Sequence, residues 1–181
     1  MEFSFRDVLD RAAAVGRDVE LADVYEIFRH GGPGAGADPE ELDAFRRRVD
    51  IPQSYADFLT YCDGWLGFDG HTDMFTIAEV LGGPAVEEAW QVVEAYDEGS
   101  DRQFGLSRDR YLVIGAAASV LSVVLLDLVS PPRVCLLAGG GVEEFPDLEA
   151  FMVDVIEIRQ ETLAELRADP WLGLPDQGGP V

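Results

Sequence analysis

Apolar residues that recur every three or four positions predict helices at the start of the chain. Ser4 and Asp7 have the spacing of a capping box, and the helix that they open should run to about Val15. A second helix should end near His30. Its apolar face would be formed by Leu21, Val24, Tyr25 and Phe28. The glycine-rich residues 31–36 then predict a flexible loop.

Start and stop signals indicate four more helices. Asp38 and Pro39 supply an N-cap and a proline at the first helical position, where the missing N–H costs nothing. Pro52 and Pro84 open helices in the same way, and Gly64 ends the first of these two. The expected helices span about 39–49, 52–62, 84–96 and 147–168.

Short apolar runs separated by glycine and proline predict strands, most of them in the second half of the chain. The expected strands cover 65–68, 74–77, 111–114, 120–126, 134–137 and 142–145. Helices, then a meander, then a closing helix indicate an α+β fold rather than a βαβ nucleotide fold. We therefore expect N-terminal helices, a mainly antiparallel sheet of about five or six strands, and a closing C-terminal helix.

The length of 181 residues suits one domain with a proper core. We divide the chain into a helical extension with a glycine-rich loop (1–37), a main domain (38–168) and a flexible tail (169–181). The tail is rich in glycine and proline, which is typical of a loose terminus.

The charge balance is strongly acidic, with 35 acids against 13 bases and a formal net charge of −22. This charge argues against nucleic acid and anionic membranes as ligands, because both need a cationic surface. It favours solubility and would speed the encounter with a basic protein. Net charge alone names no partner, so a role in solubility only remains an alternative.

Two cysteines, Cys62 and Cys135, lie far apart in apolar stretches and form no metal or disulfide motif. We expect two buried free thiols, as in a reducing compartment.

The chain opens with acids and no apolar signal core, so a cytoplasmic protein is expected. A monomer is expected, although exposed strand edges leave a weak dimer open.

One stretch carries an unusual charge pattern: Val49 to Asp101 holds twelve acids and no lysine or arginine. Unless arginines from elsewhere in the fold cover them, these acids create a negative field suited to a basic partner. The candidate partner-binding residues are Asp69, Asp73, Glu87, Glu94, Asp97, Glu98 and Asp101. The accompanying aromatics Trp65 and Trp90 are expected to be core residues.

The sequence contains only weak motifs for a metal site or a phosphate-binding loop. Asp69, His71 and Asp73 alternate, so in a strand they would share one face and could bind a divalent metal, as in a hydrolase or metal enzyme. No second cluster supplies further ligands, and a polar hairpin tip is the preferred interpretation. No strand precedes the glycine-rich loop and no lysine follows it, which argues against a phosphate cradle. We expect no catalytic residue, no bound metal and no cofactor.

The residues from Ile51 onward resemble the SUKH superfamily, which includes Smi/Knr-type cell-wall-assembly regulators and bacterial toxin-immunity proteins. The similar features are a proline-initiated helix with an aromatic and a Phe-Leu pair, a turn ending in glycine, a strand ending in aspartate, and a strand entering the last helix. The matching positions are Ile51, Pro52, Tyr55, Phe58, Leu59, Asp63, Gly64, Asp127, Phe145 and Phe151. Asp63 departs from the asparagine usual there.

The resemblance assigns 38–168 to a SUKH-like domain and implies an α+β fold without a catalytic centre. It also implies an immunity protein that neutralises a cognate toxin, such as a basic nuclease or deaminase, by direct binding. A regulatory or scaffold protein with a non-toxin partner is the alternative that the same family offers.

Overall fold

The computed structural model describes residues 4–99, 104–117, 121–129 and 131–168, apart from the side chains of 97–99. Its helices are α1 (Phe5–Ala22), α2 (Pro39–Arg48), α3 (Gln53–Tyr61), α4 (Ile77–Val80), α5 (Pro84–Gly99) and α6 (Leu148–Ala168). Its strands are β1 (Gly32–Pro33), β2 (Trp65–Leu66), β3 (Asp73–Met74), β4 (Tyr111–Ala117), β5 (Ser122–Asp127), β6 (Arg133–Ala138) and β7 (Gly141–Phe145). None of the helices in these ranges is long and apolar enough to cross a membrane.

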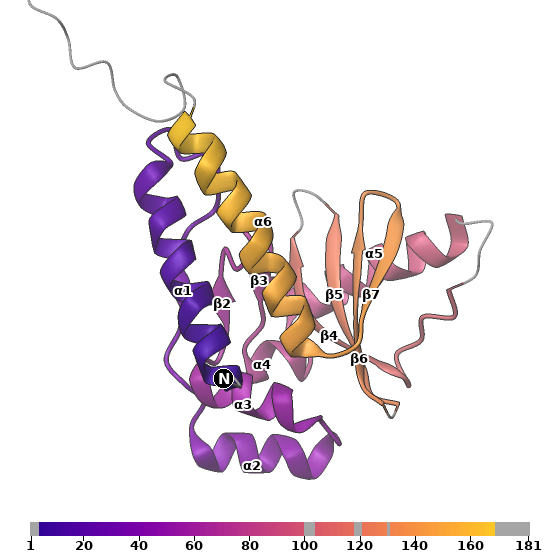
Figure 1. Ribbon diagram of the computed structural model, residues 1–181. Coiled ribbons are helices and arrows are strands. Elements are labelled where there is room, and N and C mark those ends of the chain that lie inside the picture. Colours follow the sequence, from indigo (N-terminus) through magenta and orange to yellow (C-terminus); the bar gives the residue numbers. More distant parts are fainter. Residues whose placement is uncertain (1–3, 100–103, 118–120, 130, 169–181) are drawn as a thin grey trace, which may run out of the picture.

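The strands form one antiparallel sheet in which each strand pairs with the next along the chain, from β1 to β7. Every residue of β5 is buried, so both faces of the sheet are covered there. Helix α5 lies behind the sheet in Figure 1, and α6 crosses in front of it. Packing a sheet between helices in this way buries the apolar residues of both layers.

Helices α1 and α6 run side by side in the same direction, although they lie at opposite ends of the chain (Figure 1). Arg11 contacts Gln160 near the middle of the pair, and Arg167 lies 3.8 Å from Asp18 near its end. Strand β1 also pairs with β2. Residues 5–33 are therefore packed into the same body as the rest of the described chain.

The α+β class, the antiparallel meander and the closing helix are confirmed, but the sheet has seven strands rather than five or six. The additional strand is β1, which lies within the expected glycine-rich loop and pairs Pro33 with Trp65. The expected strand at 74–77 was wrong in its second half. Thr76 forms a capping box with Glu79, and this starts α4 instead.

The expected helix ending at His30 was wrong. Helix α1 extends beyond the expected end at Val15 and reaches Ala22, and no helix follows before α2. Asp23 stops the helix, because its carboxylate accepts hydrogen bonds from the backbone N–H groups of Ile27 and Phe28. These bonds hold residues 23–30 as a compact loop, which we call the 23–30 loop.

Both cysteines are free and buried, as expected. Burial raises the pKa of the Cys62 thiol to about 12 and that of the Cys135 thiol to about 11. Both thiols are therefore protonated at neutral pH. They fill space in the core rather than acting as nucleophiles. The expected tail, 169–181, lies outside the described residues.

Candidate functional site

Arginines from distant parts of the chain reach the acidic stretch. Arg29 Nη2 lies 2.9 Å from Asp73 Oδ2. Arg108 Nη1 lies 3.0 Å from Glu87 Oε2, and its Nη2 lies 3.4 Å from Glu94 Oε1. Three of the seven candidate partner-binding carboxylates are thus already paired with a cation. The 49–101 stretch therefore has a weaker field than its sequence predicts.

Asp69 is committed to a turn. Its Oδ1 accepts hydrogen bonds from the N–H groups of His71 at 2.8 Å and Thr72 at 2.6 Å. Asp73 likewise accepts from the N–H of Gly67 at 2.8 Å. The His71 ring packs on Phe28, with ring centroids 5.6 Å apart. Among the described residues no group of three His, Cys, Asp or Glu is placed to hold a metal ion.

The candidate carboxylates do not gather at one place. Asp69 and Asp73 flank the turn before β3, whereas Glu87 and Glu94 project from α5, and Arg108 binds both of them. Asp97, Glu98 and Asp101 lie outside the residues whose side chains the structure describes.

The residues of the family resemblance are mostly core residues. Ile51, Tyr55, Phe58, Leu59, Phe145 and Phe151 are all buried. The Tyr55 hydroxyl has no hydrogen-bond partner, and burial raises its pKa. Pro52 is the N-cap residue of α3. These positions therefore pack the fold.

Asp63 and Gly64 of the same motif connect α3 to the sheet. Asp63 accepts a hydrogen bond from the N–H of Ile77 at 2.7 Å, which fixes the start of α4. Burial raises the pKa of this carboxyl group, although the bond from Ile77 opposes the effect. Gly64 has a φ of 90°, and a Cβ there would lie 2.8 Å from Thr76 Cγ2. Glycine is therefore required by both conformation and space.

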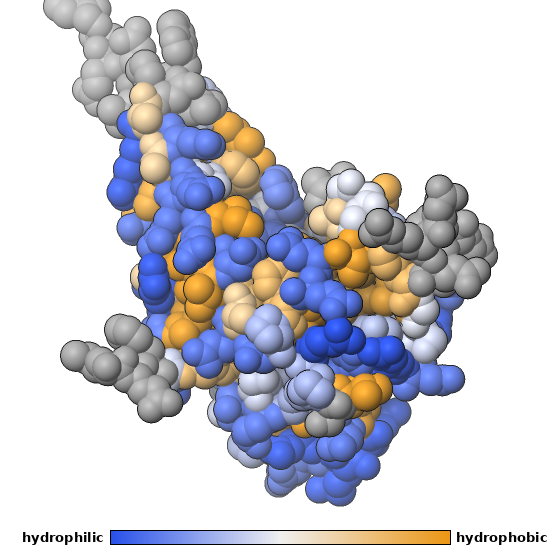
Figure 2. All heavy atoms as spheres, turned by 45° about the vertical axis from the view of Figure 1, so that its right-hand side comes forward, coloured by the Kyte–Doolittle hydropathy of each residue, from blue (hydrophilic) through white to orange (hydrophobic). Residues whose placement is uncertain are grey.

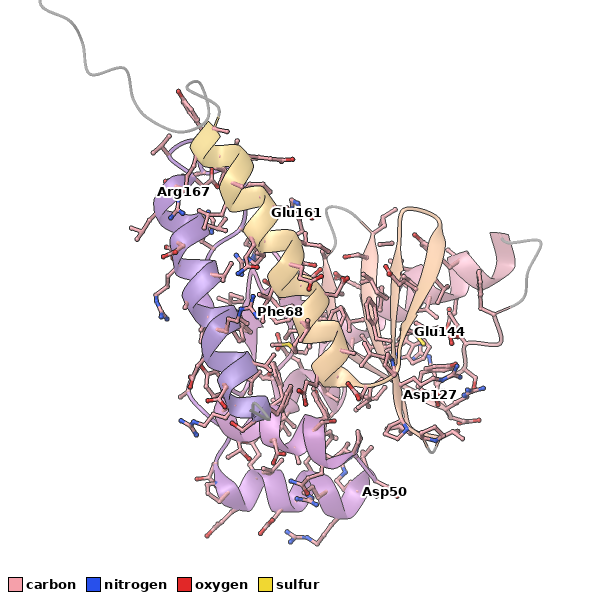
Figure 3. The ribbon with its side chains drawn as sticks, in the orientation of Figure 1. Asp50, Phe68, Asp127, Glu144, Glu161 and Arg167 are labelled. Carbon is pink, nitrogen blue, oxygen red and sulfur yellow. The ribbon has the colours of Figure 1, made fainter. Side chains whose placement is uncertain are left out.

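The buried carboxylate of Asp127 is the centre of an ion cluster at the end of β5. Arg110 binds it through Nε at 3.1 Å and Nη2 at 2.6 Å. Arg133 Nη2 lies 3.3 Å away and also reaches Glu144 on β7 through Nη1. Burial would raise the pKa of Asp127, but the two arginines and the N–H of Val129 lower it overall. Figure 3 shows Asp127 and Glu144 on the sheet side of the molecule, away from α1.

Sequence reasoning missed the 23–30 loop as a site. Asp23 has a fully buried carboxylate that accepts from the N–H groups of Ile27 at 3.0 Å and Phe28 at 2.8 Å. Its Oδ2 also lies 2.9 Å from His30 Nε2. Burial would raise the pKa of Asp23, but these hydrogen bonds lower it. The other ring nitrogen of His30, Nδ1, is buried without a partner.

Two grooves flank the 23–30 loop. The first, which we call the acidic groove, has a volume of about 510 Å³ and is lined by Glu20, Asp23, Glu26, Phe28 and His30. The second has a volume of about 420 Å³ and is lined by residues of the loop, the 70–75 segment, α5 and β4. It contains the Arg29–Asp73 pair, whose charges cancel.

A buried arginine ties α6 to the turn at residues 67–70. Arg159 of α6 donates from Nη1 to the carbonyl oxygen of Phe68 at 2.8 Å. Its guanidinium fits because Gly16 of α1 has no side chain, and a Cβ there would lie 2.9 Å from Nη1. Burial lowers the pKa of Arg159, while the charges of Asp69 and Glu20 raise it. These residues are far apart in the sequence, so no local pattern signals the contact.

No protein-family model matches this chain, and no curated protein matches it.

Proposed function

We propose that this chain is a non-catalytic protein-binding module, and specifically a cytoplasmic immunity protein that neutralises a cognate basic toxin by direct binding. The proposal combines the resemblance to the SUKH superfamily with the charge of the folded surface. The carboxylates that the sequence offered for metal binding support it, because Asp69 and Asp73 are engaged in bonds that hold the fold.

The observation that carries the proposal is the negative charge left after ion pairing. Thirteen arginines face 35 acids, so a formal charge of −22 remains however the chain folds. Within the described residues, exposed glutamates without a cationic partner follow one another along α6 at Glu157, Glu161 and Glu165. Helix α2 adds Glu40 and Glu41, and Figure 2 shows hydrophilic residues over most of the visible surface.

A surface of this kind attracts a basic protein and repels nucleic acid. Opposite charges can raise the association rate constant by one to three orders of magnitude at low salt. Nucleases and deaminases that act on nucleic acid carry cationic grooves, since phosphate binding requires them. An acidic protein that docks over such a groove blocks the substrate by competing for the same charges.

Affinity capture with the full chain, at about 0.05 M and about 0.5 M salt, tests the proposal. We expect a basic partner that is retained at low salt and lost at high salt. The captured protein should be toxic when expressed alone and harmless when this chain is expressed with it. A partner that is retained but not toxic would favour a regulatory or scaffold role, and the absence of any basic partner would refute the proposal.

A further inference from the structure

We propose, on the basis of the protein-binding function above, that the end of α1 and the 23–30 loop form the docking face for a basic segment of the partner. An arginine or lysine of that segment enters the acidic groove. Its apolar neighbour packs on a shelf of exposed side chains beside the groove. We call this set the apolar shelf; it consists of Leu21, Val24, Tyr25 and Ile27.

The apolar shelf is the densest exposed apolar cluster in the described sequence. Leu21 is 81% exposed, Tyr25 55%, Ile27 50% and Val24 44%. Nine large apolar residues of the described chain are exposed, and four of them fall within these seven consecutive positions. Single exposed apolar side chains are ordinary, but four of them within one short exposed segment favour an interaction site.

Hydrogen bonds within the loop and to a neighbouring turn fix its backbone, so these side chains stay exposed in the folded protein. Asp23 and Phe28 occupy the inner positions of the loop, and Asp23 binds the N–H groups of Ile27 and Phe28. The N–H of Arg29 donates to the carbonyl oxygen of Gly70 at 2.7 Å, which ties the loop to the neighbouring turn. A face that is already ordered loses little conformational entropy when a partner binds.

The acidic groove has the chemistry to receive a cation. Three carboxylates line it, and no arginine or lysine does. Asp23 is already satisfied by three hydrogen bonds, whereas the exposed carboxylates of Glu20 and Glu26 form no ion pair with a described residue. The half-buried ring of Phe28 adds an aromatic surface on which a guanidinium can stack.

The size and charge of the groove favour a long basic side chain. It is an open concavity of about 510 Å³, which leaves room for a long side chain. Arg159 attracts Glu20 from the inner side without an ion pair to it. Glu20 and Glu26 together supply the attraction for an incoming cation.

The test uses isotope-labelled full chain and two synthetic peptides, one of leucine and arginine and one in which glutamate replaces every arginine. We expect the arginine peptide to shift the amide signals of residues 20–30 and the glutamate peptide to leave them unchanged. Glu20→Gln with Glu26→Gln should weaken binding of the arginine peptide about tenfold. Leu21→Ser with Tyr25→Ser should weaken it by a similar factor.

The matched control is Glu40→Gln with Glu41→Gln on α2, which removes the same charge from a distant helix. It should change the peptide affinity less than twofold. An equal loss in the control, or signal shifts on another surface, would overturn the proposal, because net charge alone would then explain binding. Two other occupants would also overturn it. If the Trp171→Ala variant binds the peptide more tightly, the C-terminal tail covers the apolar shelf. If the unmodified chain self-associates and Tyr25→Ser abolishes this, a second copy of the chain covers the shelf.

The captured partner separates this inference from the function on which it rests. If the Glu20→Gln, Glu26→Gln variant captures the basic partner as well as the unmodified chain does, the docking face is wrong and the proposed function stands. If the unmodified chain binds the arginine peptide at residues 20–30 but captures no basic protein, the face stands and the proposed function fails.

Discussion

Replacing Asp127 by asparagine tests whether the ion cluster around this buried carboxylate stabilises the fold. The Asp127 side chain is 0% exposed and holds Arg110, Arg133 and the N–H of Val129. Asparagine keeps one acceptor oxygen for the Val129 N–H. Its amide N–H groups would face the Nη2 atoms of the two arginines, donor against donor. The variant therefore keeps the shape of the side chain and removes its charge.

The size of the loss follows from burial. Removing one partner of a buried pair costs about 3–5 kcal/mol, because the other charge stays buried and unpaired. Here Arg110 and Arg133 are 39% and 36% exposed, so water can solvate them again. We therefore expect the free energy of unfolding to fall by about 3 kcal/mol, the lower end of this range. For a chain of this length that lowers Tm by about 6–12 °C.

Urea denaturation followed by tryptophan fluorescence measures this difference, and an unchanged m-value would show that the unfolded state is unaffected. Glu144→Gln is the matched control. Glu144 is 53% exposed and touches the same Arg133, so its loss should cost less than about 0.5 kcal/mol. Equal effects of the two variants would refute the reasoning, because burial of Asp127 would then contribute nothing.

Three further outcomes are expected. Tyr55→Phe should raise the free energy of unfolding by about 1 kcal/mol in urea denaturation, since it removes a buried hydroxyl without a partner; a loss would mean that the hydroxyl is satisfied. Gly64→Ala should lower Tm in calorimetry by the equivalent of about 1–3 kcal/mol, because alanine is strained at a φ of 90°; an unchanged Tm would contradict this. Asp23 has a folded pKa below its ordinary value of 3.8, so its stabilisation is present above about pH 4 and lost as pH falls through the folded pKa. The Tm difference between the unmodified chain and Asp23→Asn should therefore shrink below pH 4, and a constant difference would exclude this linkage.

Local signals predicted most of the regular structure. Asp38 accepts from the N–H of Glu40 at 2.8 Å, so the cap inferred from its position before Pro39 starts α2 as expected. Strand β5 was found because its apolar run is buried on both faces of the sheet. Such elements depend on neighbours within a few residues, and a single sequence contains that information.

The misassigned region shows where a local pattern is ambiguous. Leu21, Val24 and Tyr25 have helical spacing, yet all three are exposed, and only Leu21 lies in a helix, at the end of α1. The periodicity of apolar residues identifies a helix only when those residues face a core. Here the carboxylate of Asp23 accepts hydrogen bonds from the following N–H groups, and the half-buried side chain of Phe28 packs on His71. The loop is also tied to Gly70, far along the chain, by the N–H of Arg29.

The distribution of charge over the folded surface was harder to predict from the sequence than the secondary structure. The 49–101 stretch contains no arginine, but Arg29 and Arg108 pair with its carboxylates from outside. Pairing of this kind leaves surplus charge wherever arginines do not reach. Glu26 is such a place, because it forms no ion pair with a described residue and Arg29, its nearest cation in sequence, pairs with Asp73. The 23–30 loop, where the helix prediction was wrong, thus combines the unpaired carboxylate of Glu26 with exposed apolar side chains. A docking face requires both together, since charge speeds the encounter of two proteins and buried apolar contacts hold the complex.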